Sequence, residues 1–442
     1  MGPELGRAAT RHLHGAAPYR VAMVAACPFP YPRGTPVRIL HMADALARRG
    51  HDVHVVTYHL GERARAGRFA VHRIPDVPTY RNCSPGPTWQ KLAVVDPLLA
   101  VSLARVLWRH RIDVVHAHHV EGLLVALAAV ATRPWHPLPV VFDAHTLLES
   151  ELPFYALGLG ERAKAWLGRT LDARLPRRAA HVIAVTEDVE RRLLALAPAL
   201  AGRTSVITSG VELEHFGGER ARAAWAPGWR GAPRTLVYAG NLAAYQGIDL
   251  MLRAFAEVRR TRRDVRLRLV SDSPFGAYEP LAAALGVRDA IDVVPSRFDD
   301  LPRHLAGAAV ALNPRTSCDG IPQKLLNYMA AGRPIVSFAG SAKDLTHGTL
   351  GWVVADGDVP GFARAIHRLL DDPALARSLG ENALAYVRAE RSWERVAERT
   401  EEVYRRVAPR GTGRPAATLP PGARGTRDMD ATSDARADVP AR

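Results

Sequence analysis

Short apolar runs with strand character alternate along this chain with longer segments whose apolar residues recur at helical spacing. Before residue 217 the runs lie at 20–27, 53–57, 113–117, 140–144, 181–186 and 205–208. The first two enclose a loop at 28–36 and a helical segment at 37–49, which Gly50 closes. Strand, helix and strand in this order form a βαβ unit, and such units require a parallel sheet.

The same alternation restarts after a segment rich in Gly, Pro and Trp at 217–233, which we interpret as a linker. The later runs lie at 235–238, 266–270, 291–294, 310–313 and 335–338. With 442 residues the chain is too long for one hydrophobic core, so we predict two domains. The fold class that this pattern predicts is α/β, with two doubly wound parallel sheets.

The two ends of the chain lack this alternation. The tail is rich in Gly, Pro, Ala, Arg and Asp, a composition typical of disorder. The last helix before it opens at Ser392, a residue type that caps helices. The predicted parts are a flexible leader at 1–18, an N-terminal domain at 19–216, the linker at 217–233, a C-terminal domain at 234–390, a closing helix at 391–408 and a disordered tail at 409–442.

The chain carries a formal net charge of +15, and Lys and Arg together number 59. Only four of these are lysines, namely Lys91, Lys164, Lys324 and Lys343. Because Lys and Arg are not equivalent, a lysine kept against this bias indicates a place that needs a compact point charge. The arginines are dispersed and no recognised binding module is present, so we expect no nucleic-acid partner.

The cysteines and the apolar runs indicate the compartment. Three widely separated cysteines without a CxxC pair favour a reducing environment and argue against a disulfide framework. The first twenty residues contain no apolar run, and no segment reaches the ~20 apolar residues of a membrane-spanning helix. We expect a cytoplasmic protein that is either soluble or peripheral on the inner face of the cell membrane.

Two predicted helices suit a membrane surface. Residues 160–178 predict a basic amphipathic helix in which Leu167, Leu171 and Leu175 stand among many cations. Residues 88–110 predict a largely apolar helix with two tryptophans. Basic amphipathic helices more often present a solvated face, so peripheral contact with anionic membrane is one of two open interpretations.

The stretch 319–336 places charged groups around the start of a short helix. Pro322 suits its first position, and Gly332 suits the left-handed residue after its end. Asp319 therefore precedes a helix N-terminus and Lys324 lies in the first turn, where free N–H groups and the helix dipole attract an anion. This arrangement indicates a cradle for a sugar that carries a diphosphate, and an ordinary capped helix is the alternative.

Histidines stand where two predicted strands end. His116, His118 and His119 stand at the end of the run 113–117, and His145 follows the run 140–144. Ligands bind beyond the carboxyl ends of the strands in open parallel sheets, so we expect a functional role for His145 and His118, with simple packing as the alternative. We find no Cys, Asp or Glu at ligand spacing beside them and therefore predict no metal site. The loop at 28–36 lacks GxGxxG, so a dinucleotide is not predicted either.

Motifs in a set order over residues 19–408 resemble the GT-B glycosyltransferases of the large retaining family 4, also called glycosyl transferase group 1. Residues 33–35 and 43–56 resemble the first loop, helix and second strand of that family, and 206–216 resemble its interdomain hinge. Residues 238–242 and 245–250 resemble the start of its donor domain. The Tyr245-Gln246-Gly247 variant of that start is similar to a branch linked to exopolysaccharide assembly.

The resemblance implies a GT-B fold, with two Rossmann-like domains facing across a cleft and a closing helix, which carries Trp393 and Tyr404, crossing back to the first. It also implies metal-independent transfer of a sugar from a nucleotide-sugar donor with retained configuration, and no cofactor. Asp319 and His145 or His118 would reach the donor sugar from opposite domains. The implied catalytic residues are Asp319, His145 and His118, and the implied donor-binding residues are Gly34, Gly240, Asn241, Gln246, Gly320, Ile321, Lys324 and Asn327.

The chain departs from the family pattern at four positions. Asp319 and Asn327 stand, eight apart, where the family has paired glutamates, and Asn327 carries no charge. The basic pair that grips the donor diphosphate falls on Asn241 and Gln246, which are both neutral. We therefore predict that Lys324 contacts the diphosphate instead. The alternative cations are Arg297, Arg315 and Arg333.

These features predict a glycosyltransferase that moves a sugar to a saccharide or to a lipid-linked acceptor at the membrane. An acceptor that is small and soluble is the first alternative. The second is an inactive GT-B-like scaffold of a polysaccharide assembly complex, which the two neutral positions favour and the cradle at Asp319 opposes.

Overall fold

The computed structural model of this chain describes residues 17–31, 34–61, 68–83, 86, 88–155, 158, 160–216, 234–318 and 320–409. The predicted linker at 217–233 and nearly all of the predicted leader and tail lie outside these residues, as does Asp319. The predicted domain boundaries therefore stay predictions.

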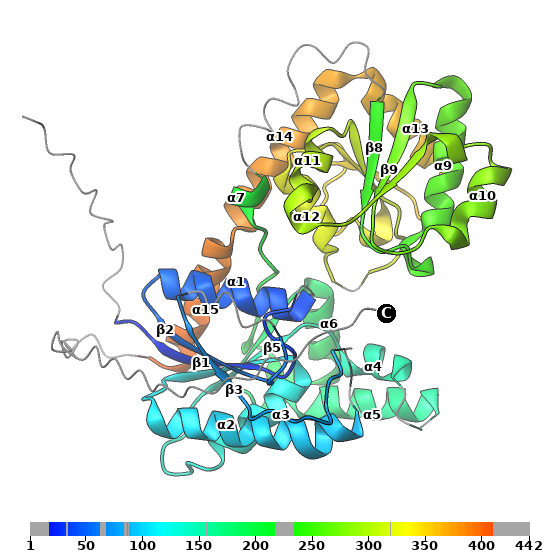
Figure 1. The fold of residues 1–442 in the computed structure, drawn as a ribbon. Helices are drawn as coiled ribbons and strands as arrows, with labels where there is room; N and C mark the ends of the chain where they lie inside the picture. Colours follow the sequence, from blue (N-terminus) through cyan, green and yellow to red (C-terminus); the bar gives the residue numbers. More distant parts are fainter. Residues whose placement is uncertain are drawn as a thin grey trace, which may run out of the picture. The chain divides into compact units, whose positions relative to one another are not determined.

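Seven parallel strands form the first sheet, in the order β3-β2-β1-β4-β5-β6-β7 (Figure 1). They are β1 (Arg20–Ala25), β2 (Asp52–Thr57), β3 (Ala70–Arg73), β4 (Val114–His118), β5 (Val140–Ala144), β6 (His181–Ala184) and β7 (Thr204–Val206). The central strands are almost wholly buried, as expected where helices cover both faces. The strand order reverses between β1 and β4, and such a switch point is where doubly wound sheets bind ligands.

Helices cover both faces of this sheet (Figure 1). On one face, α1 (Gly34–Arg48) and α15 (Trp393–Val407) pack against each other and share an apolar cluster with β1 and β2. On the other face, α2 (Asp96–Arg109) and α3 (His119–Val130) pack together. The following helices are α4 (Leu148–Glu151), α5 (Glu161–Arg174), α6 (Glu187–Leu196) and α7 (Leu213–Phe216).

Six parallel strands form the second sheet, in the order β10-β9-β8-β11-β12-β13. They are β8 (Arg234–Ala239), β9 (Val265–Val270), β10 (Ile291–Val294), β11 (Val310–Asn313), β12 (Ile335–Phe338) and β13 (Trp352–Val354). This order also has one reversal, between β8 and β11. The second sheet therefore has its own switch point, at the carboxyl ends of those two strands.

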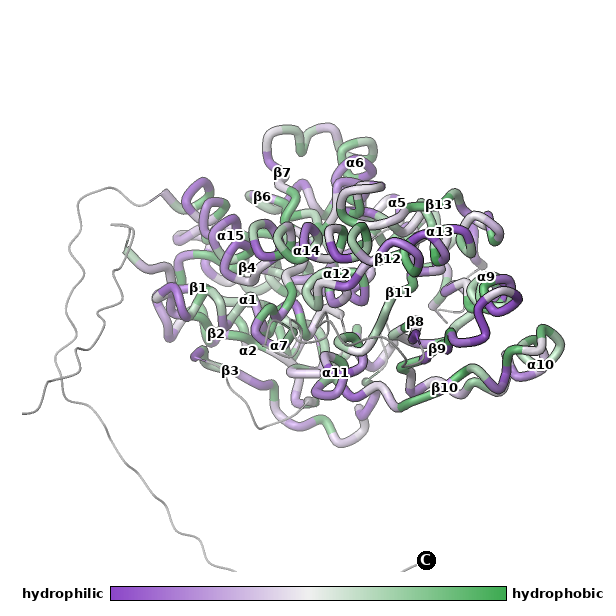
Figure 2. The backbone as a smooth tube through the Cα atoms, turned by 90° about the horizontal axis from the view of Figure 1, so that it is seen from above, coloured by the Kyte–Doolittle hydropathy of each residue, from purple (hydrophilic) through white to green (hydrophobic). Residues whose placement is uncertain are grey.

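Two apolar clusters lie on opposite faces of the second sheet. One includes residues of α9 (Ile248–Thr261) and α13 (Val359–Asp371), whose alternating hydrophobic and hydrophilic colours in Figure 2 mark them as amphipathic. The other includes α12 (Gln323–Ala330) and part of α14 (Pro373–Glu390). Shorter helices are α10 (Glu279–Ala284) and α11 (Leu301–Ala306).

The last helix, α15, packs on the first sheet although it follows the second sheet in the chain. Ser392 caps it as predicted, because its Oγ accepts a hydrogen bond from the backbone N–H of Arg395 at 3.1 Å. Tyr404 is fully buried, and the ring of Trp393 stacks on His41 of α1 with centroids 5.1 Å apart. Of the two aromatic residues that the resemblance placed on a closing helix, Tyr404 thus contacts the first sheet and Trp393 contacts α1.

The predicted fold class is confirmed, because both sheets are parallel and doubly wound. Strands β5, β10, β11 and β12 have the predicted bounds, and most other elements differ from the prediction by a few residues. Strands β3 and β13 were not predicted. Each lies at or near a sheet edge, is short and is partly exposed, so the apolar run that identifies a buried strand is weak there.

The predicted helix at 160–178 is shorter than expected. Helix α5 ends at Arg174, and a separate turn of 3-10 helix follows at Pro176–Arg178. Its leucines pack against the core of the first sheet, and the ammonium group of Lys164 donates to the backbone carbonyls of Pro153 and Tyr155 at 2.7 and 2.9 Å. The leucines of this helix therefore face the protein core, and membrane contact by its basic side stays a prediction.

Candidate functional site

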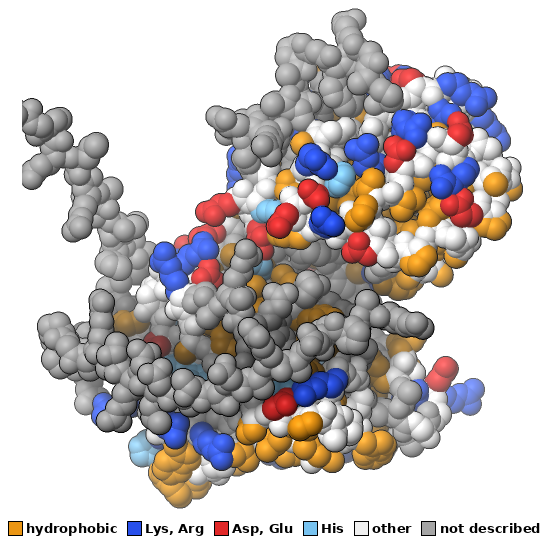
Figure 3. Space-filling model, viewed as in Figure 1, with side chains coloured by type: hydrophobic (Ala, Val, Ile, Leu, Met, Phe, Trp, Pro, Cys, Tyr) orange, Lys and Arg blue, Asp and Glu red, His pale blue; other side chains and the backbone are white. Residues whose placement is uncertain are grey.

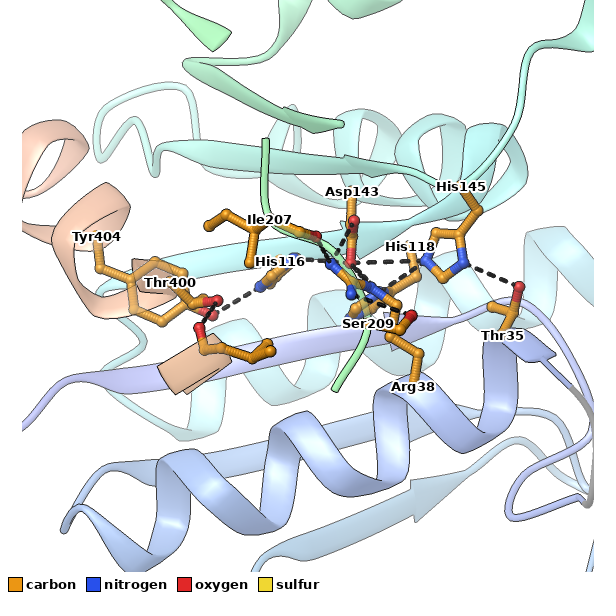
Figure 4. Close-up of polar contacts among 11 residues, drawn as sticks. Thr35, Arg38, His116, His118, Asp143, His145, Ile207, Ser209, Thr400 and Tyr404 are labelled. Atoms are coloured by element: carbon orange, nitrogen blue, oxygen red, sulfur yellow. Dashed lines mark hydrogen bonds and ion pairs between the residues drawn. The ribbon is translucent and has the colours of Figure 1, made fainter. Parts of the chain in front are cut away.

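Adjacent parallel strands bring the predicted histidines together at the switch point of the first sheet. β4 ends at His118, which pairs in register with Asp143 on β5 and with Ala25 on β1. His145 follows the last residue of β5. Figure 4 shows the His118 and His145 rings next to the carboxylate of Asp143, with Arg38 reaching it from α1.

Asp143 is the centre of these contacts. Its Oδ2 lies 3.1 Å from His118 Nδ1, 3.6 Å from His145 Nε2 and 3.8 Å from His116 Nε2. The guanidinium of Arg38 donates to both carboxylate oxygens, from Nε at 2.8 Å and from Nη2 at 3.2 Å. The prediction that no carboxylate accompanies these histidines is wrong, because β5 places Asp143 among them.

The charges of this cluster follow from burial and from Arg38. Burial disfavours the charged form of Asp143, but Arg38 and the neighbouring His145 outweigh it and hold the pKa of that carboxyl well below its usual range. Burial lowers the pKa of His145 to about 4, although Asp143 opposes the shift. Burial also lowers the pKa of His118. At neutral pH the cluster therefore holds one buried ion pair and uncharged imidazoles that can donate or accept a hydrogen bond.

The two predicted catalytic histidines differ in access. The His118 ring is buried, and its Nε2 has no hydrogen-bond partner among the residues that the structure describes. The His145 side chain is 10% exposed, and its Nδ1 lies 3.1 Å from the Oγ1 of Thr35 in the first turn of α1. Gly34 begins that helix and is exposed, and a Cβ there would meet nothing within 4 Å. His145 is thus the more accessible ring and contacts Thr35, next to the predicted donor-binding residue Gly34. The Nδ1 of His118 lies 3.4 Å from the Nε2 of His145.

Two further elements support the cluster from behind. The Tyr404 hydroxyl on α15 lies 2.7 Å from His116 Nδ1, and the His116 ring stacks on His118 with centroids 4.5 Å apart. Arg38 Nη2 also donates to the backbone carbonyl of Ile207, just after β7, at 2.8 Å. Contacts from α15 and from the residue after β7 therefore help to hold the residues of the site in place.

Four of the predicted donor-binding residues, Gly240, Asn241, Gln246 and Lys324, meet at the switch point of the second sheet. β8 ends at Ala239, and Gly240 and Asn241 follow it. Gly247, with φ of +70°, turns the chain into α9, and a Cβ there would lie 2.2 Å from the carbonyl oxygen of Pro314, so only glycine fits. This close approach brings Gln246 next to the loop that follows β11.

Lys324 lies beside both neutral positions. Its ammonium group donates to Gln246 Oε1 at 2.6 Å and to the Tyr238 hydroxyl at 2.9 Å, and it lies 4.2 Å from the centroid of the Tyr238 ring. The Tyr238 hydroxyl in turn donates to the backbone carbonyl of Asn241 at 2.7 Å, and Gln246 Nε2 lies 3.4 Å from Asn241 Oδ1. Burial, and then Arg315, lower the pKa of Lys324 to about 7.

The three alternative cations have different surroundings. Arg333 is buried, and its guanidinium donates to the carbonyls of Ala331, Ala306 and Ala308 at 3.0, 3.2 and 3.4 Å. It is therefore committed to backbone acceptors. Arg297 is exposed on the loop after β10. Arg315 lies over the ring of Tyr245, 4.9 Å from its centroid, and is the alternative with the better position beside Lys324.

The remaining predicted residues surround the start of α12. Gly320 and Ile321 precede this helix, Pro322 is its N-cap, and Asn327 is buried within it. Gly240 approaches Lys324 so closely that a Cβ there would lie 3.4 Å from the ammonium nitrogen. Asp319 lies outside the described residues, so its convergence with His145 stays a prediction.

Sequence reasoning missed Asp143, Arg38 and Tyr238. The signal for Asp143 was present, because a carboxylate inside the apolar strand 140–144 needs a partner. Arg38 lies four residues before Met42, on the apolar face of α1, which is a similar signal. Tyr238 gave no signal, because a tyrosine is an ordinary strand residue.

Two families of known proteins match large parts of this chain. Residues 32–215 match the family described as Glycosyltransferase Family 4, and residues 233–372 match the one described as Glycosyl transferases group 1. A D-inositol 3-phosphate glycosyltransferase from Acidothermus cellulolyticus is 30% identical over an alignment that covers 91% of this chain and 94% of that protein.

Solved structures share the fold at lower identity. The sucrose-phosphate synthase of Thermosynechococcus elongatus has a TM-score of 0.69 at 20% identity, covering 88% of this chain and 99% of that one. HepE from Anabaena, in complex with UDP and glucose, has a TM-score of 0.64 at 16% identity, covering 87% and 98%. Both matched families and the Acidothermus relative lead to one conclusion: this chain belongs to the glycosyltransferases of family 4 (group 1) and has their GT-B fold.

Proposed function

We propose that this chain is a retaining, metal-independent glycosyltransferase that transfers a sugar from a nucleotide-sugar donor. The observation that carries the proposal is the position of Lys324. It supplies a cation at the switch point of the second sheet, next to Asn241 and Gln246, where the family has a basic pair. Lys324 therefore binds the phosphates in place of that pair, and this argues against the inactive-scaffold alternative.

The residues at the two switch points have different proposed roles. Lys324 binds the donor diphosphate and stabilises the charge that develops on it as the bond to the sugar breaks. Its partners Gln246 and Tyr238 hold the ammonium group in place. His145, uncharged at neutral pH, makes a hydrogen bond to the sugar, and Asp143 fixes its ring. Positioning of this kind accounts for transfer without a covalent intermediate.

A screen of nucleotide sugars by thermal shift tests the donor. A donor that binds only the folded state raises the melting temperature once its concentration exceeds the Kd. The complex of HepE with UDP and glucose supports UDP-glucose as the first compound, followed by GDP- and ADP-sugars. Transfer that retains configuration gives a product with the anomeric form of the donor, which NMR reports directly. No shift with any donor favours the scaffold alternative.

We further propose that the acceptor is carried by a lipid. Among the described residues, no helix combines the length and the apolar character needed to cross a membrane. A peripheral contact is supported instead by exposed apolar side chains before and along α2, namely Trp89, Leu92, Val94, Val101 and Trp108. Figure 3 shows hydrophobic side chains gathered along the lower edge of the molecule, where Figure 1 places α2 and α3.

An apolar groove on the same face supports a lipid. It has a volume of about 370 Å³ between α2 and α3, and Val101, Ala104, Trp108 and Ala128 are among the residues that line it. Arg105 and Arg109 stand at this groove and suit the phosphate groups of anionic lipid. The predicted segment 88–110 therefore has the stronger membrane face, while α5 contributes Trp166.

A soluble acceptor is the alternative that the relative from Acidothermus favours, because its name specifies D-inositol 3-phosphate. A transfer assay with the identified donor separates the two acceptors. Activity that appears only with membrane lipid extract supports the lipid-linked acceptor. Equal turnover of inositol phosphate without lipid supports the soluble one.

A further inference from the structure

A second cluster of histidines lies at the edge of the first sheet, away from the site described above. It consists of His54 on β2, His72 on the edge strand β3 and His110 just after α2, and we call it the edge cluster. One ring nitrogen of each histidine lies within 4.8 Å of the other two. We propose that the edge cluster binds a divalent transition-metal ion, with Zn²⁺ as the best match.

The sheet itself brings two of the ligands together. In the register of β2 and β3, His54 pairs with Ala70 and Val56 pairs with His72. His54 and His72 are therefore diagonal neighbours, and because side chains alternate along a strand, both lie on the same face. Val56 lies in the apolar cluster that includes α2, so this is the face that α2 covers. His110 follows the last residue of α2 and is held there by its backbone N–H, which donates to the Val106 carbonyl at 2.9 Å.

The distances are close to those of a three-histidine metal site. A tetrahedral Zn²⁺ with Zn–N bonds of about 2.0–2.1 Å holds its ligand nitrogens about 3.3 Å apart. His54 Nδ1 and His72 Nε2 are 3.0 Å apart, and the His54 and His110 ring centroids are 4.2 Å apart. The nitrogens of the three rings lie within 4.8 Å of one another, so binding requires the half-buried His72 and His110 rings to rotate toward the ion. Three protein ligands leave a fourth position for water.

The other ring nitrogen of His54 has a suitable partner for such a site. His54 Nε2 is buried and has no hydrogen bond of good geometry among the described residues, but it lies 3.3 Å from Asp52 Oδ1. Metal-ligating histidines commonly donate their second ring N–H to a carboxylate, which fixes the tautomer and makes the ligand more basic. With Nε2 directed at Asp52, His54 presents Nδ1 to the ion.

The chemistry of the edge cluster favours a soft or borderline cation. Three imidazoles suit Zn²⁺ or its transition-metal neighbours and not Mg²⁺ or Ca²⁺, which prefer oxygen ligands. The group formed by His116, His118 and Asp143 is a poorer candidate, because the guanidinium of Arg38 already occupies both oxygens of Asp143. A metal at the edge cluster would join β2, β3 and the end of α2.

This site is separate from the proposed transfer chemistry. His54 is the third residue of β2 and pairs with Ala22 of β1, whereas His118 pairs with Ala25 at the other end of that strand. Three residues of strand correspond to about 10 Å. Bound Zn²⁺ would therefore stabilise an edge of the sheet, and the proposal does not depend on the donor or the acceptor.

Zinc titration of the full chain, after treatment with a chelator, tests the proposal by calorimetry. We expect one equivalent of Zn²⁺ to bind and to raise the melting temperature. His72→Ala and His110→Ala should each abolish most of the affinity. Asp52→Asn leaves the three ligands in place and should weaken binding by about 10- to 100-fold, as loss of a carboxylate partner does. Because Asp52 is exposed, this variant also serves if an alanine variant fails to fold.

The control is His136→Ala, which removes an exposed histidine outside the cluster and should bind zinc like the unchanged protein. Co²⁺ in place of Zn²⁺ should give the visible absorption of a tetrahedral site, and that signal should be lost in His72→Ala. The proposal is overturned if the unchanged protein binds no zinc. It is also overturned if His72→Ala, His110→Ala and Asp52→Asn all keep its zinc affinity, since the ion then binds elsewhere.

Discussion

The guanidinium of Arg38 on α1 meets both carboxylate oxygens of Asp143 on β5, at 2.8 and 3.2 Å, and neither side chain is more than 2% exposed. The carboxylate of this ion pair also lies 3.1 Å from His118 Nδ1 and 3.6 Å from His145 Nε2. It therefore connects the stability of the first sheet to the orientation of the predicted catalytic histidines.

Breaking the Arg38–Asp143 pair should lower the free energy of unfolding. In Asp143→Asn the Arg38 cation stays buried without its counter-charge, and we expect a loss of about 3–5 kcal/mol in the free energy of unfolding, measured with urea. Adding Arg38→Met to that variant removes the orphaned charge and should recover part of the loss. The control is Asp44→Asn, which breaks the more exposed pair with Arg48 on the same helix and should cost about 0.5 kcal/mol or less. Equal effects of Asp143→Asn and Asp44→Asn would contradict the importance of burial.

His145 and Asp319 are predicted to reach the donor sugar. His145→Ala and Asp319→Asn should each lower kcat by about 10²-fold, the typical effect of removing one hydrogen bond made in the transition state. Circular dichroism and the melting temperature should stay close to those of the unchanged protein. His136→Ala, which changes an exposed histidine, is the control and should leave kcat unchanged. Wild-type turnover in both site variants would show that neither residue takes part in the reaction.

Lys324 is predicted to bind the donor diphosphate. A hydrogen bond to a charged group contributes about 1.5–3 kcal/mol, so Lys324→Gln should raise the donor Kd by about 10- to 100-fold. Gln246→Lys in that background should restore part of the affinity, because the two side chains are adjacent. Arg315→Gln tests the alternative cation. If Lys324→Gln leaves the Kd unchanged while Arg315→Gln raises it, Arg315 is the phosphate ligand.

The same lysine predicts how donor binding depends on pH. Burial lowers the pKa of Lys324 to about 7, so above this pH a growing fraction of the free protein is uncharged there. The diphosphate of a nucleotide sugar stays ionised, and it favours the protonated lysine. The donor Kd should therefore rise above pH 7, by up to about tenfold per pH unit, with uptake of a proton on binding. Lys324→Arg keeps its charge and should remove this dependence, whereas a dependence that persists in Lys324→Arg would have another source.

The apolar face of α2 is predicted to contact anionic membrane. The full chain should cosediment with vesicles that contain anionic lipid, and added salt should weaken the binding. Replacing Val101 and Trp108 together with serine removes exposed apolar area and should reduce the bound fraction. Val293→Ser changes an exposed apolar residue of the second sheet and is the control. Equal cosedimentation of the double variant and the control would exclude this face.

Much of the fold follows from local properties of the sequence. The apolar runs, the helical spacing between them and residues such as Ser392 and Gly332 act within a few neighbours, so they predict strands, helices and ends directly. Two rounds of this pattern predict two parallel sheets. The few lysines in this arginine-rich chain also occupy specific places, as predicted. Lys91 and Lys164 each direct a buried ammonium group at oxygen acceptors, and so does the partly exposed Lys324.

The composition of each site depends on strands and helices that are far apart in the chain. Asp143 meets Arg38 across 105 residues, Lys324 meets Gln246 across 78, and His54 meets His72 through the pairing of an edge strand that was not predicted. Packing likewise decides which side of a leucine-bearing helix is covered, and the leucines of α5 face the core of the first sheet. The sequence by itself determined most of the elements and which ends of the strands carry polar residues. Only the tertiary structure decided which side chains meet, because strand order and register, and not sequence distance, set those contacts.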